Sequence, residues 1–232
     1  MTSKLPGKKS SATDIQAFIG QVKNTLPATY AGKGRLIFAM DATASREHCW
    51  DMASHQHAAM FAEAGKVSAL SVQLCYYRGM GEFKALPWTR GADEIKHALL
   101  SVRCLAGQTQ IAKILTHALN ETRTTKVNAL VFVGDCVEEN QDSLGALAGQ
   151  LGILNLPLFI FQEGNNSKAR SVFSHLAKLS GGAHCQFDEG SAKQLGHLLA
   201  AVAVYAAGGK PALTNNLLSQ DASVRRLLQQ LK

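Results

Sequence analysis

The sequence has no segment that would direct the chain into or across a membrane. Its first thirty residues contain no continuous apolar stretch of the kind found in secretory signals. The longest apolar stretch, residues 198–207, is too short to cross a bilayer, which takes about 20 apolar residues in a helix. From these two absences we expect a cytoplasmic protein.

The cysteines show no pattern of pairing. There are five of them, no two are spaced as Cys-x-x-Cys, and they are scattered along the chain: Cys49, Cys75, Cys104, Cys136 and Cys185. A disulfide-stabilised secreted domain normally has an even number of cysteines at close spacing. We therefore interpret these residues as free thiols in a reducing compartment.

The middle of the chain lacks a net positive charge, although the net charge of the whole chain is +7. Residues 1–35 contribute +5 and residues 209–232 contribute +3, which leaves −1 for residues 36–208. A nucleic-acid-binding domain would show basic residues interleaved with aromatic ones along its body, and this middle section has no such stripe. We expect no specific nucleic-acid partner, and we interpret the basic ends as solubilising tails.

Short apolar segments alternate with helix-like segments from residue 35 onward, in a chain whose length and composition indicate one globular domain. Strands are predicted at residues 35–40, 67–77, 83–86, 127–133, 156–161 and 183–187. Helices are predicted at residues 45–64, 92–102, 110–121, 138–151, 167–179 and 191–206. This alternation predicts an α/β fold: a doubly wound, mostly parallel sheet with helices on both faces and one short antiparallel edge strand, residues 83–86.

Both ends of the chain are predicted to lie outside the strand–helix units. Residues 1–12 are predicted to be disordered, and residues 13–25 to form a helix that begins the domain; the domain spans residues 13–208, with its core at 34–208. A Gly-Gly-Lys-Pro sequence interrupts the helical pattern before the tail, residues 209–232. The tail has an apolar stripe of helical spacing: Leu217, Val224, Leu227, Leu228 and Leu231. We predict an amphipathic helix there, docked on its own domain.

Three polar clusters are predicted at one edge of the sheet. Asp41, Thr43 and Ser45 follow the first buried strand at alternate positions, so their side chains can converge. Thr109 lies in the loop that enters a predicted helix, and Asp135 follows the strand at residues 127–133. Ligands of open α/β sheets bind at the carboxyl ends of the strands. The sequence therefore predicts a ligand site at this edge.

The five side chains provide two carboxylates and three hydroxyls. Oxygen ligands suit a hard divalent cation, Mg²⁺ (or Mn²⁺). The two carboxylates balance the charge of such an ion and leave no surplus negative charge. A carboxylate from outside the protein can therefore bind at an open coordination position.

These clusters resemble the metal ion-dependent adhesion site (MIDAS) of von Willebrand factor A (VWA) domains. The motifs are Asp-x-Thr-x-Ser at residues 41–45, Gly-x-Thr-x-Ile at residues 107–111 and an Asp after a strand, and the likeness extends over residues 35–206. The resemblance implies a VWA/Rossmann-like fold, with metal bound by the hydroxyls of Thr43, Ser45 and Thr109 and, directly or through water, by Asp41 and Asp135. It also implies that a Glu or Asp of a partner protein completes the coordination shell.

Three positions depart from the common MIDAS pattern. Thr43 stands where Ser is commonest, Gln108 replaces a usual Gly, and Cys136 follows Asp135 where Gly is frequent. None of these departures removes a ligand. Cys136 crowds the loop, so this departure bears on the affinity for the metal and not on the presence of the site.

Helix capping is the simplest alternative for each cluster. Asp41 and Ser45 could cap the helix predicted from residue 45, and Asp135 could cap the helix that follows it, since Asp and Ser are leading N-cap residues. Capping is favoured for any one cluster taken alone. The metal site is favoured for the three clusters together.

Two further sites have weaker support. A zinc site formed by His48, Cys49, His55 and His57 has no accompanying Cys-x-x-Cys pair, and we favour a polar helix face instead. Cys136 has no His in its motif that could activate it as a nucleophile. We favour a buried or half-buried thiol at this position.

The predicted site favours a protein-binding module, an adaptor or a subunit of a multi-protein complex, over an enzyme. No group near Asp41 and Asp135 resembles a general base, so we predict no catalysis. The resemblance suggests a multi-protein machine, such as an AAA+ ATPase, as the partner. Two alternatives remain. One is a Mg²⁺-dependent phosphohydrolase with Asp41 as nucleophile, although Thr43 stands where such an enzyme has its second carboxylate; the other is a structural subunit with a vestigial metal site.

Overall fold

The computed structural model describes residues 34–46, 70–187 and 192–231. Several predictions concern residues outside these ranges: the disordered segment 1–12, the helix at residues 13–25 and most of the helix at residues 45–64. The possible zinc ligands His48, Cys49, His55 and His57 also lie outside the described residues. Within the described ranges, no helix is both long enough and apolar enough to cross a membrane.

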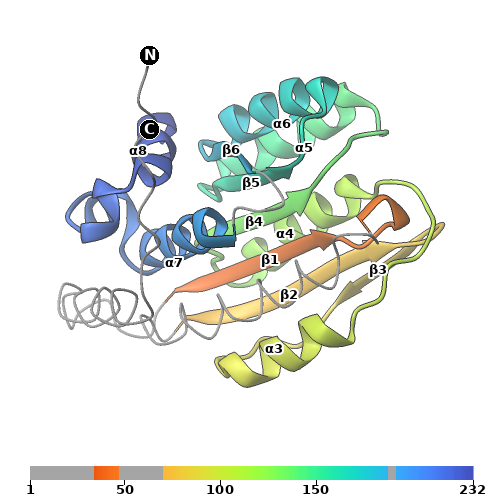
Figure 1. Ribbon diagram of the computed structural model, residues 1–232, viewed down its shortest axis with the longest axis horizontal. Helices are drawn as coiled ribbons and strands as arrows, with labels where there is room; N and C mark the ends of the chain where they lie inside the picture. Colours follow the sequence, from red (N-terminus) through yellow and green to blue (C-terminus); the bar gives the residue numbers. More distant parts are fainter. Residues whose placement is uncertain (1–33, 47–69, 188–191, 232) are drawn as a thin grey trace, which may run out of the picture.

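A six-stranded sheet forms the centre of the molecule, in the order β3-β2-β1-β4-β5-β6 (Figure 1). Its strands are β1 (Arg35–Asp41), β2 (Ser71–Arg78), β3 (Glu82–Ala85), β4 (Ala129–Gly134), β5 (Leu158–Glu163) and β6 (Ala183–Phe187). Neighbouring strands are parallel except for the edge pair β2–β3, which is antiparallel. The predicted fold class, including the single antiparallel edge strand, is confirmed.

Helices cover both faces of the sheet, which explains why the central strands are apolar without alternation. The described helices are α3 (Ala92–Ser101), α4 (Ile111–Thr124), α5 (Gln141–Ile153), α6 (Ser167–Ser180), α7 (Ala192–Thr214) and α8 (Ala222–Gln230). Phe38 and Met40 of β1 pack in one apolar cluster with α3, α7 and α8. Ile37 and Ala39 pack in a second cluster with α4, α5 and α6.

The observed helix boundaries differ from the predicted ones by a few residues. The helix predicted at residues 138–151 begins at Gln141, because Asn140 is its N-cap and accepts a hydrogen bond from the Ser143 N–H. The break predicted at residues 208–211 is confirmed: Gly209 has non-helical backbone angles (φ 70°, ψ −170°), which divide α7 into two helical segments, the second of which continues to Thr214. Pro211 is compatible with this continuation because it stands in the first turn after the kink, where its missing N–H has no intrahelical partner to lose.

The C-terminal tail packs on the domain. A 3-10 helix, η3 (Leu217–Gln220), leads into α8, whose Val224 and Leu227 are buried in the same cluster as the sheet. The side-chain amide of Gln230 bonds both backbone groups of His184 on the edge strand β6: it accepts from the His184 N–H at 2.9 Å and donates to the His184 carbonyl at 3.0 Å. The tail thus contains the helix α8, and the division of the chain into segment, domain and tail stays a prediction.

Candidate metal centre

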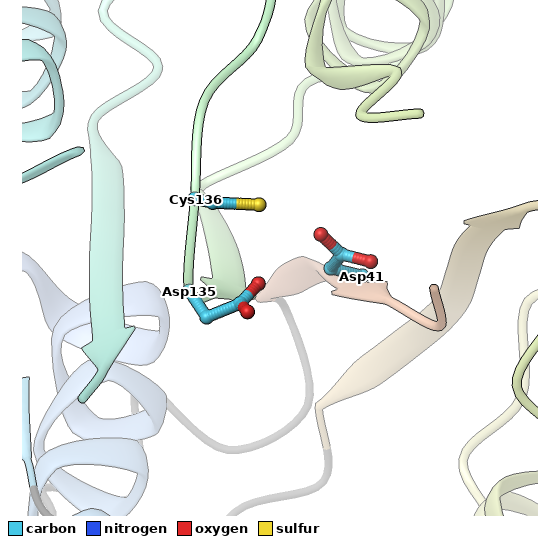
Figure 2. Close-up of side chains that lie close together, drawn as sticks. All are labelled: Asp41, Asp135 and Cys136. Atoms are coloured by element: carbon cyan, nitrogen blue, oxygen red, sulfur yellow. The ribbon is translucent and has the colours of Figure 1, made fainter. Parts of the chain in front are cut away.

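The candidate site lies where the two central strands β1 and β4 end side by side. Met40 of β1 pairs with Val133 of β4, so the residues that follow in each strand emerge at the same edge of the sheet. Gly134 leaves room for neighbouring side chains, since a Cβ at this position would lie 2.6 Å from the Phe132 ring and 3.6 Å from the Cβ of Asp41. Asp41 and Asp135 are thereby brought together, as predicted (Figure 2).

Asp41 is fully buried, and both of its carboxylate oxygens accept a hydrogen bond. The Thr43 N–H donates to Oδ1 and the Tyr77 hydroxyl donates to Oδ2, each at 2.8 Å. Burial, followed by the charge of Asp41, raises the pKa of Tyr77 well above its ordinary value, so this phenol remains a donor. Hydrogen-bond donors of this kind fix the orientation of a carboxylate that binds a metal. Sequence analysis did not identify Tyr77, because only the tertiary fold brings its hydroxyl to Asp41.

The hydroxyls of Thr43 and Ser45 lie 3.1 Å apart. A 3-10 turn, η2 (Ala44–Arg46), brings these two alternate side chains to the same side of the chain. Thr43 is buried whereas Ser45 is exposed. Thr43 also forms a parallel bridge with Leu105, and the Leu105 N–H donates to the Ala42 carbonyl at 3.1 Å. The first predicted cluster therefore lies against the loop that leads to Thr109.

Thr109 is buried and is bonded to the loop that follows β4. Its N–H donates to Glu138 Oε2 at 2.8 Å, and its hydroxyl oxygen accepts from the Glu138 N–H at 3.1 Å. The Glu139 carboxylate accepts from the N–H groups of Ile111 and Ala112 at 2.6 and 2.8 Å, at the start of α4. These bonds hold the Thr109 loop against the loop that contains Asp135.

Glu138 and Glu139 hold the loops of the candidate site together, and neither was identified from the sequence. The N-cap residue of α4, Gln110, makes no side-chain capping bond, and Glu139 supplies that interaction from another part of the chain. Burial raises the pKa of Glu139, although its two backbone hydrogen bonds act in the opposite direction. The adjacent pair of glutamates shortly after Asp135 was the available signal, but both residues also fit the start of a helix.

Asp135 has a buried carboxylate oxygen, Oδ1, that accepts no hydrogen bond from any described residue. An orphaned buried acceptor costs about 1–3 kcal/mol, and more when it is charged. Figure 2 shows the Asp135 carboxylate facing Asp41. The capping alternative for Asp135 is wrong, since Asn140 caps α5. A buried acceptor beside a second carboxylate fits a bound cation.

Cys136 joins the two carboxylates in a group that could hold a metal ion. One carboxylate oxygen of Asp41, one of Asp135 and the Cys136 sulfur all lie within 4.8 Å of one another, and this is the one such group among the described residues. Burial, then the charges of Asp135 and Asp41, raises the pKa of the Cys136 thiol to about 12. The predicted half-buried thiol is confirmed. A thiol with a raised pKa is a poor nucleophile, which argues against the nucleophile alternative.

The five predicted ligands therefore fall into three groups on adjoining loops. Asp41 and Asp135 meet, Thr43 and Ser45 share a hydrogen bond, and Thr109 lies on a neighbouring loop bonded to Glu138. The geometry provides carboxylates and hydroxyls at one edge of the sheet. That all five bind one ion stays a prediction.

Comparisons with known structures identify the fold. The chain is similar to the SpRpn10 VWA domain, with 12% sequence identity, a TM-score of 0.56 and coverage of 71% of this chain and 94% of that domain. It is similar to the von Willebrand factor type A protein from Catenulispora acidiphila, with 13% identity, a TM-score of 0.59 and coverage of 77% and 43%. It is also similar to proximal thread matrix protein 1 (PTMP1) from the mussel byssus with a zinc-occupied MIDAS motif, with 14% identity, a TM-score of 0.58 and coverage of 76% and 47%.

The chain thus spans nearly all of one of these structures and less than half of the other two. No protein-family model matches the sequence, and no curated protein matches it either. The likeness is therefore one of fold. The order and direction of the strands and the helices on both faces agree with the fold that the sequence motifs implied. The chain has the fold of a von Willebrand factor A domain.

Proposed function

We propose that this protein is a metal-dependent protein-binding module, a cytoplasmic adaptor or subunit of a multi-protein complex. In this proposal Asp41, Thr43, Ser45, Thr109 and Asp135 hold a Mg²⁺ (or Mn²⁺) ion in a MIDAS site. An acidic side chain of a partner, Glu or Asp, completes the coordination shell.

The observation that supports this proposal most strongly is the orphaned Oδ1 of Asp135. It is buried, it lies beside the fully buried carboxylate of Asp41, and no described residue donates a hydrogen bond to it. Two carboxylates this close repel each other unless a cation or a proton lies between them. A divalent cation removes both the repulsion and the missing hydrogen bond.

The ligand chemistry favours a hard cation that keeps an open position. The carboxylates of Asp41 and Asp135 balance a divalent charge, and the hydroxyls of Thr43, Ser45 and Thr109 are neutral. When bound, the ion attracts an anionic oxygen ligand from outside. Mg²⁺ retains several exchangeable waters in such sites, and a partner carboxylate can replace one of them.

Exposed apolar side chains next to the site support a protein as the partner. Met80 is 83% exposed at the tip of the β2–β3 turn, and Leu105 is 52% exposed in the loop before Thr109. The Gly79 N–H donates to the Leu105 carbonyl at 3.2 Å, so these two loops adjoin. The Lys113 ammonium also donates to the Gly81 carbonyl at 2.6 Å, which fixes the turn. Apolar side chains on fixed loops are suited to protein contact.

One similar structure is a protein of a coat: the human COPII-coat protein Sec24c, at 10% identity, a TM-score of 0.51 and coverage of 80% of this chain and 33% of that one. By analogy, we propose a partner within a multi-protein machine, such as an AAA+ ATPase.

The phosphohydrolase alternative is less compatible with the site. A nucleophilic carboxylate must reach its substrate, whereas Asp41 is fully buried and both of its oxygens already accept hydrogen bonds. A vestigial metal site is also disfavoured, because a site that had lost its metal would have no reason to retain the orphaned oxygen of Asp135.

The test is a calorimetric titration of the metal-free protein with Mg²⁺ and Mn²⁺, combined with partner capture in Mg²⁺ and in EDTA. We expect one binding site, lost in Asp41→Asn and Asp135→Asn and retained in Asp93→Asn, which alters an exposed aspartate on α3. We also expect EDTA and Asp135→Asn to abolish partner capture. Capture that persists in both conditions would contradict the proposal. Turnover of a generic phosphate ester that is lost in Asp41→Asn would favour the enzyme instead.

A further inference from the structure

We propose that Cys136 is a third protein ligand at this site, and that the site therefore binds a thiophilic divalent cation of the Zn²⁺ class as well as Mg²⁺. This inference rests on the proposed function, because it concerns the same ion position. It goes beyond that function by assigning a ligand and a class of ion that an oxygen-only site would not have.

The geometry allows the Cys136 sulfur to bind the same ion as the two carboxylates. The three ligand atoms lie within 4.8 Å of one another. Even if all three separations were 4.8 Å, their common centre would lie only about 2.8 Å from each atom. Zinc binds sulfur at about 2.3 Å and carboxylate oxygen at about 2.0–2.2 Å. Side-chain movements of less than about 1 Å therefore close the site around an ion.

The surrounding chain holds Cys136 in this place. It follows Gly134 and Asp135, whose position is fixed by the end of β4, and it precedes Val137, which is buried in the apolar cluster with α4 and α5. Beyond Val137, Glu138 is bonded to Thr109. In Figure 2 the Cys136 side chain extends from this loop toward Asp41, and the Asp135 carboxylate approaches from below it. The loop is therefore anchored on both sides of the thiol.

The other described cysteines lack this setting. Cys75 is buried in the apolar cluster that contains Ile37 and Ala39. Cys185 is buried in the cluster that contains Phe38 and Met40, and the partly buried Cys104 packs against that same cluster. None of them belongs to a group of three possible metal ligands. Cys136 is thus distinguished by its neighbours and not merely by being a cysteine.

A sulfur ligand widens the range of ions that the site binds. Mg²⁺ binds oxygen almost exclusively, whereas Zn²⁺ binds thiolate, carboxylate and hydroxyl or water oxygen together. Zn²⁺ also exceeds the hard divalent ions in general affinity for mixed ligand sets. On binding Zn²⁺, the Cys136 thiol gives up its proton to solvent and the sulfur bonds the metal.

The two ions therefore use the same position with different ligand sets. With Mg²⁺ bound, Cys136 remains a neutral thiol and the two carboxylates balance the ion. With Zn²⁺ bound, the thiolate adds a third negative charge, so the site has a net charge of −1. A zinc-loaded site then attracts an acidic partner less strongly than a magnesium-loaded one.

The experiment uses the full chain, reduced and freed of metal, with Co²⁺ as the probe. Cobalt replaces zinc in mixed sulfur and oxygen sites and shows a near-ultraviolet sulfur-to-metal charge-transfer band when a thiolate binds it. The variants are Cys136→Ser, the control Cys104→Ser at another partly buried cysteine, and Asp135→Asn. The affinity for Zn²⁺ is measured by competition with a chelating dye, and the affinity for Mg²⁺ by calorimetry.

We expect the charge-transfer band to saturate at one equivalent of Co²⁺ in the unmodified protein and in Cys104→Ser. Cys136→Ser should lose the band and at least about tenfold of the Zn²⁺ affinity, since even outer-shell partners of metal ligands affect affinity by 10- to 100-fold. Urea unfolding of Cys136→Ser in EDTA should match that of the unmodified protein, which establishes that the variant is folded.

Two results would overturn the inference and leave the proposed function standing. The first is the absence of the charge-transfer band in the unmodified protein. The second is a charge-transfer band or a Zn²⁺ affinity that is the same in Cys136→Ser as in the unmodified protein. In both cases the proposed function stands if Asp135→Asn abolishes Mg²⁺ binding. Mg²⁺ binding that Asp135→Asn leaves unchanged would contradict the proposed function itself, and the inference would fail with it.

Discussion

Replacement of Asp135 by asparagine should have opposite effects on stability in the absence and presence of metal. Without a cation, the side chain holds a buried oxygen with no hydrogen bond, beside the carboxylate of Asp41. Asparagine has nearly the same shape and no charge. D135N should therefore raise the free energy of unfolding in EDTA, whereas most substitutions of partly buried residues lower it.

The magnitude follows from two terms. An orphaned buried acceptor costs about 1–3 kcal/mol. The two carboxylate oxygens lie within 4.8 Å of each other, and at that limit the repulsion between two full charges amounts to about 3.5 kcal/mol at an effective dielectric constant of about 20. The partial exposure of Asp135 reduces this severalfold. In the variant the amide oxygen at position 135 is still a buried acceptor without a donor, so part of the cost of about 1–3 kcal/mol persists. We therefore expect a net stabilisation of about 1 kcal/mol in EDTA. For a chain of this length, that raises Tm by about 2–4 °C.

Metal reverses the order of stability. A ligand at a concentration 100 times its Kd stabilises a folded protein by about 2.7 kcal/mol. The unmodified protein should gain about this much in Mg²⁺, while D135N gains little, so the variant becomes the less stable protein by about 1–2 kcal/mol.

The assay is urea or thermal unfolding in EDTA and in Mg²⁺, with D93N as the matched control on the exposed surface of α3. The control should match the unmodified protein in both conditions. A D135N variant that is less stable in EDTA, or that gains as much from Mg²⁺ as the unmodified protein, would refute the reasoning.

Three further predictions concern the carboxylate support, the partner surface and pH. Tyr77→Phe removes the donor to Asp41 Oδ2 and should lower Mg²⁺ affinity about 10-fold by calorimetry; unchanged affinity would exclude the positioning role. Met80→Ser with Leu105→Ser should weaken partner capture several-fold but leave Mg²⁺ affinity unaltered, and full capture would show that the partner does not contact this surface. Burial, followed by the charge of a nearby arginine, lowers the pKa of His184 to about 4, so its contribution to stability is present above about pH 6.5 and is lost as the pH falls toward 4. A pKa lowered from 6.5 to about 4 corresponds to about 3.4 kcal/mol, which the partial exposure of His184 reduces. Urea unfolding should therefore show a loss of about 2 kcal/mol over that range, and His184→Gln should flatten the profile; an unchanged profile would contradict the assignment.

The sheet could be predicted from the sequence because its central strands are buried on both faces. Continuous apolar segments identified β1, β4 and β5, and the glycine-rich turn before β3 identified the antiparallel edge. The polar residues at the strand ends then followed from topology. Asp41 and Asp135 meet because parallel neighbouring strands end at the same edge of the sheet.

The support of the site could not be predicted, because it depends on contacts between distant residues. Tyr77 fits the pattern of a strand, and nothing local indicates that its hydroxyl reaches Asp41, 36 positions away. Glu138 and Glu139 suit a helix start, yet their carboxylates bond the chain around Thr109, 27–29 positions away. The sequence predicts only that Cys136 crowds its loop, whereas in the fold its sulfur lies beside the carboxylates of Asp41 and Asp135.

The central claim concerns where a cation binds, and a crystal grown with Mn²⁺ tests it most directly through the anomalous signal of the metal. We predict one strong anomalous peak at the ends of β1 and β4, within coordination distance of Asp41 and Asp135 and of the hydroxyls of Thr43, Ser45 and Thr109, directly or through one water. The absence of a peak there, or a peak elsewhere with the carboxylates of Asp41 and Asp135 turned apart, would contradict the account.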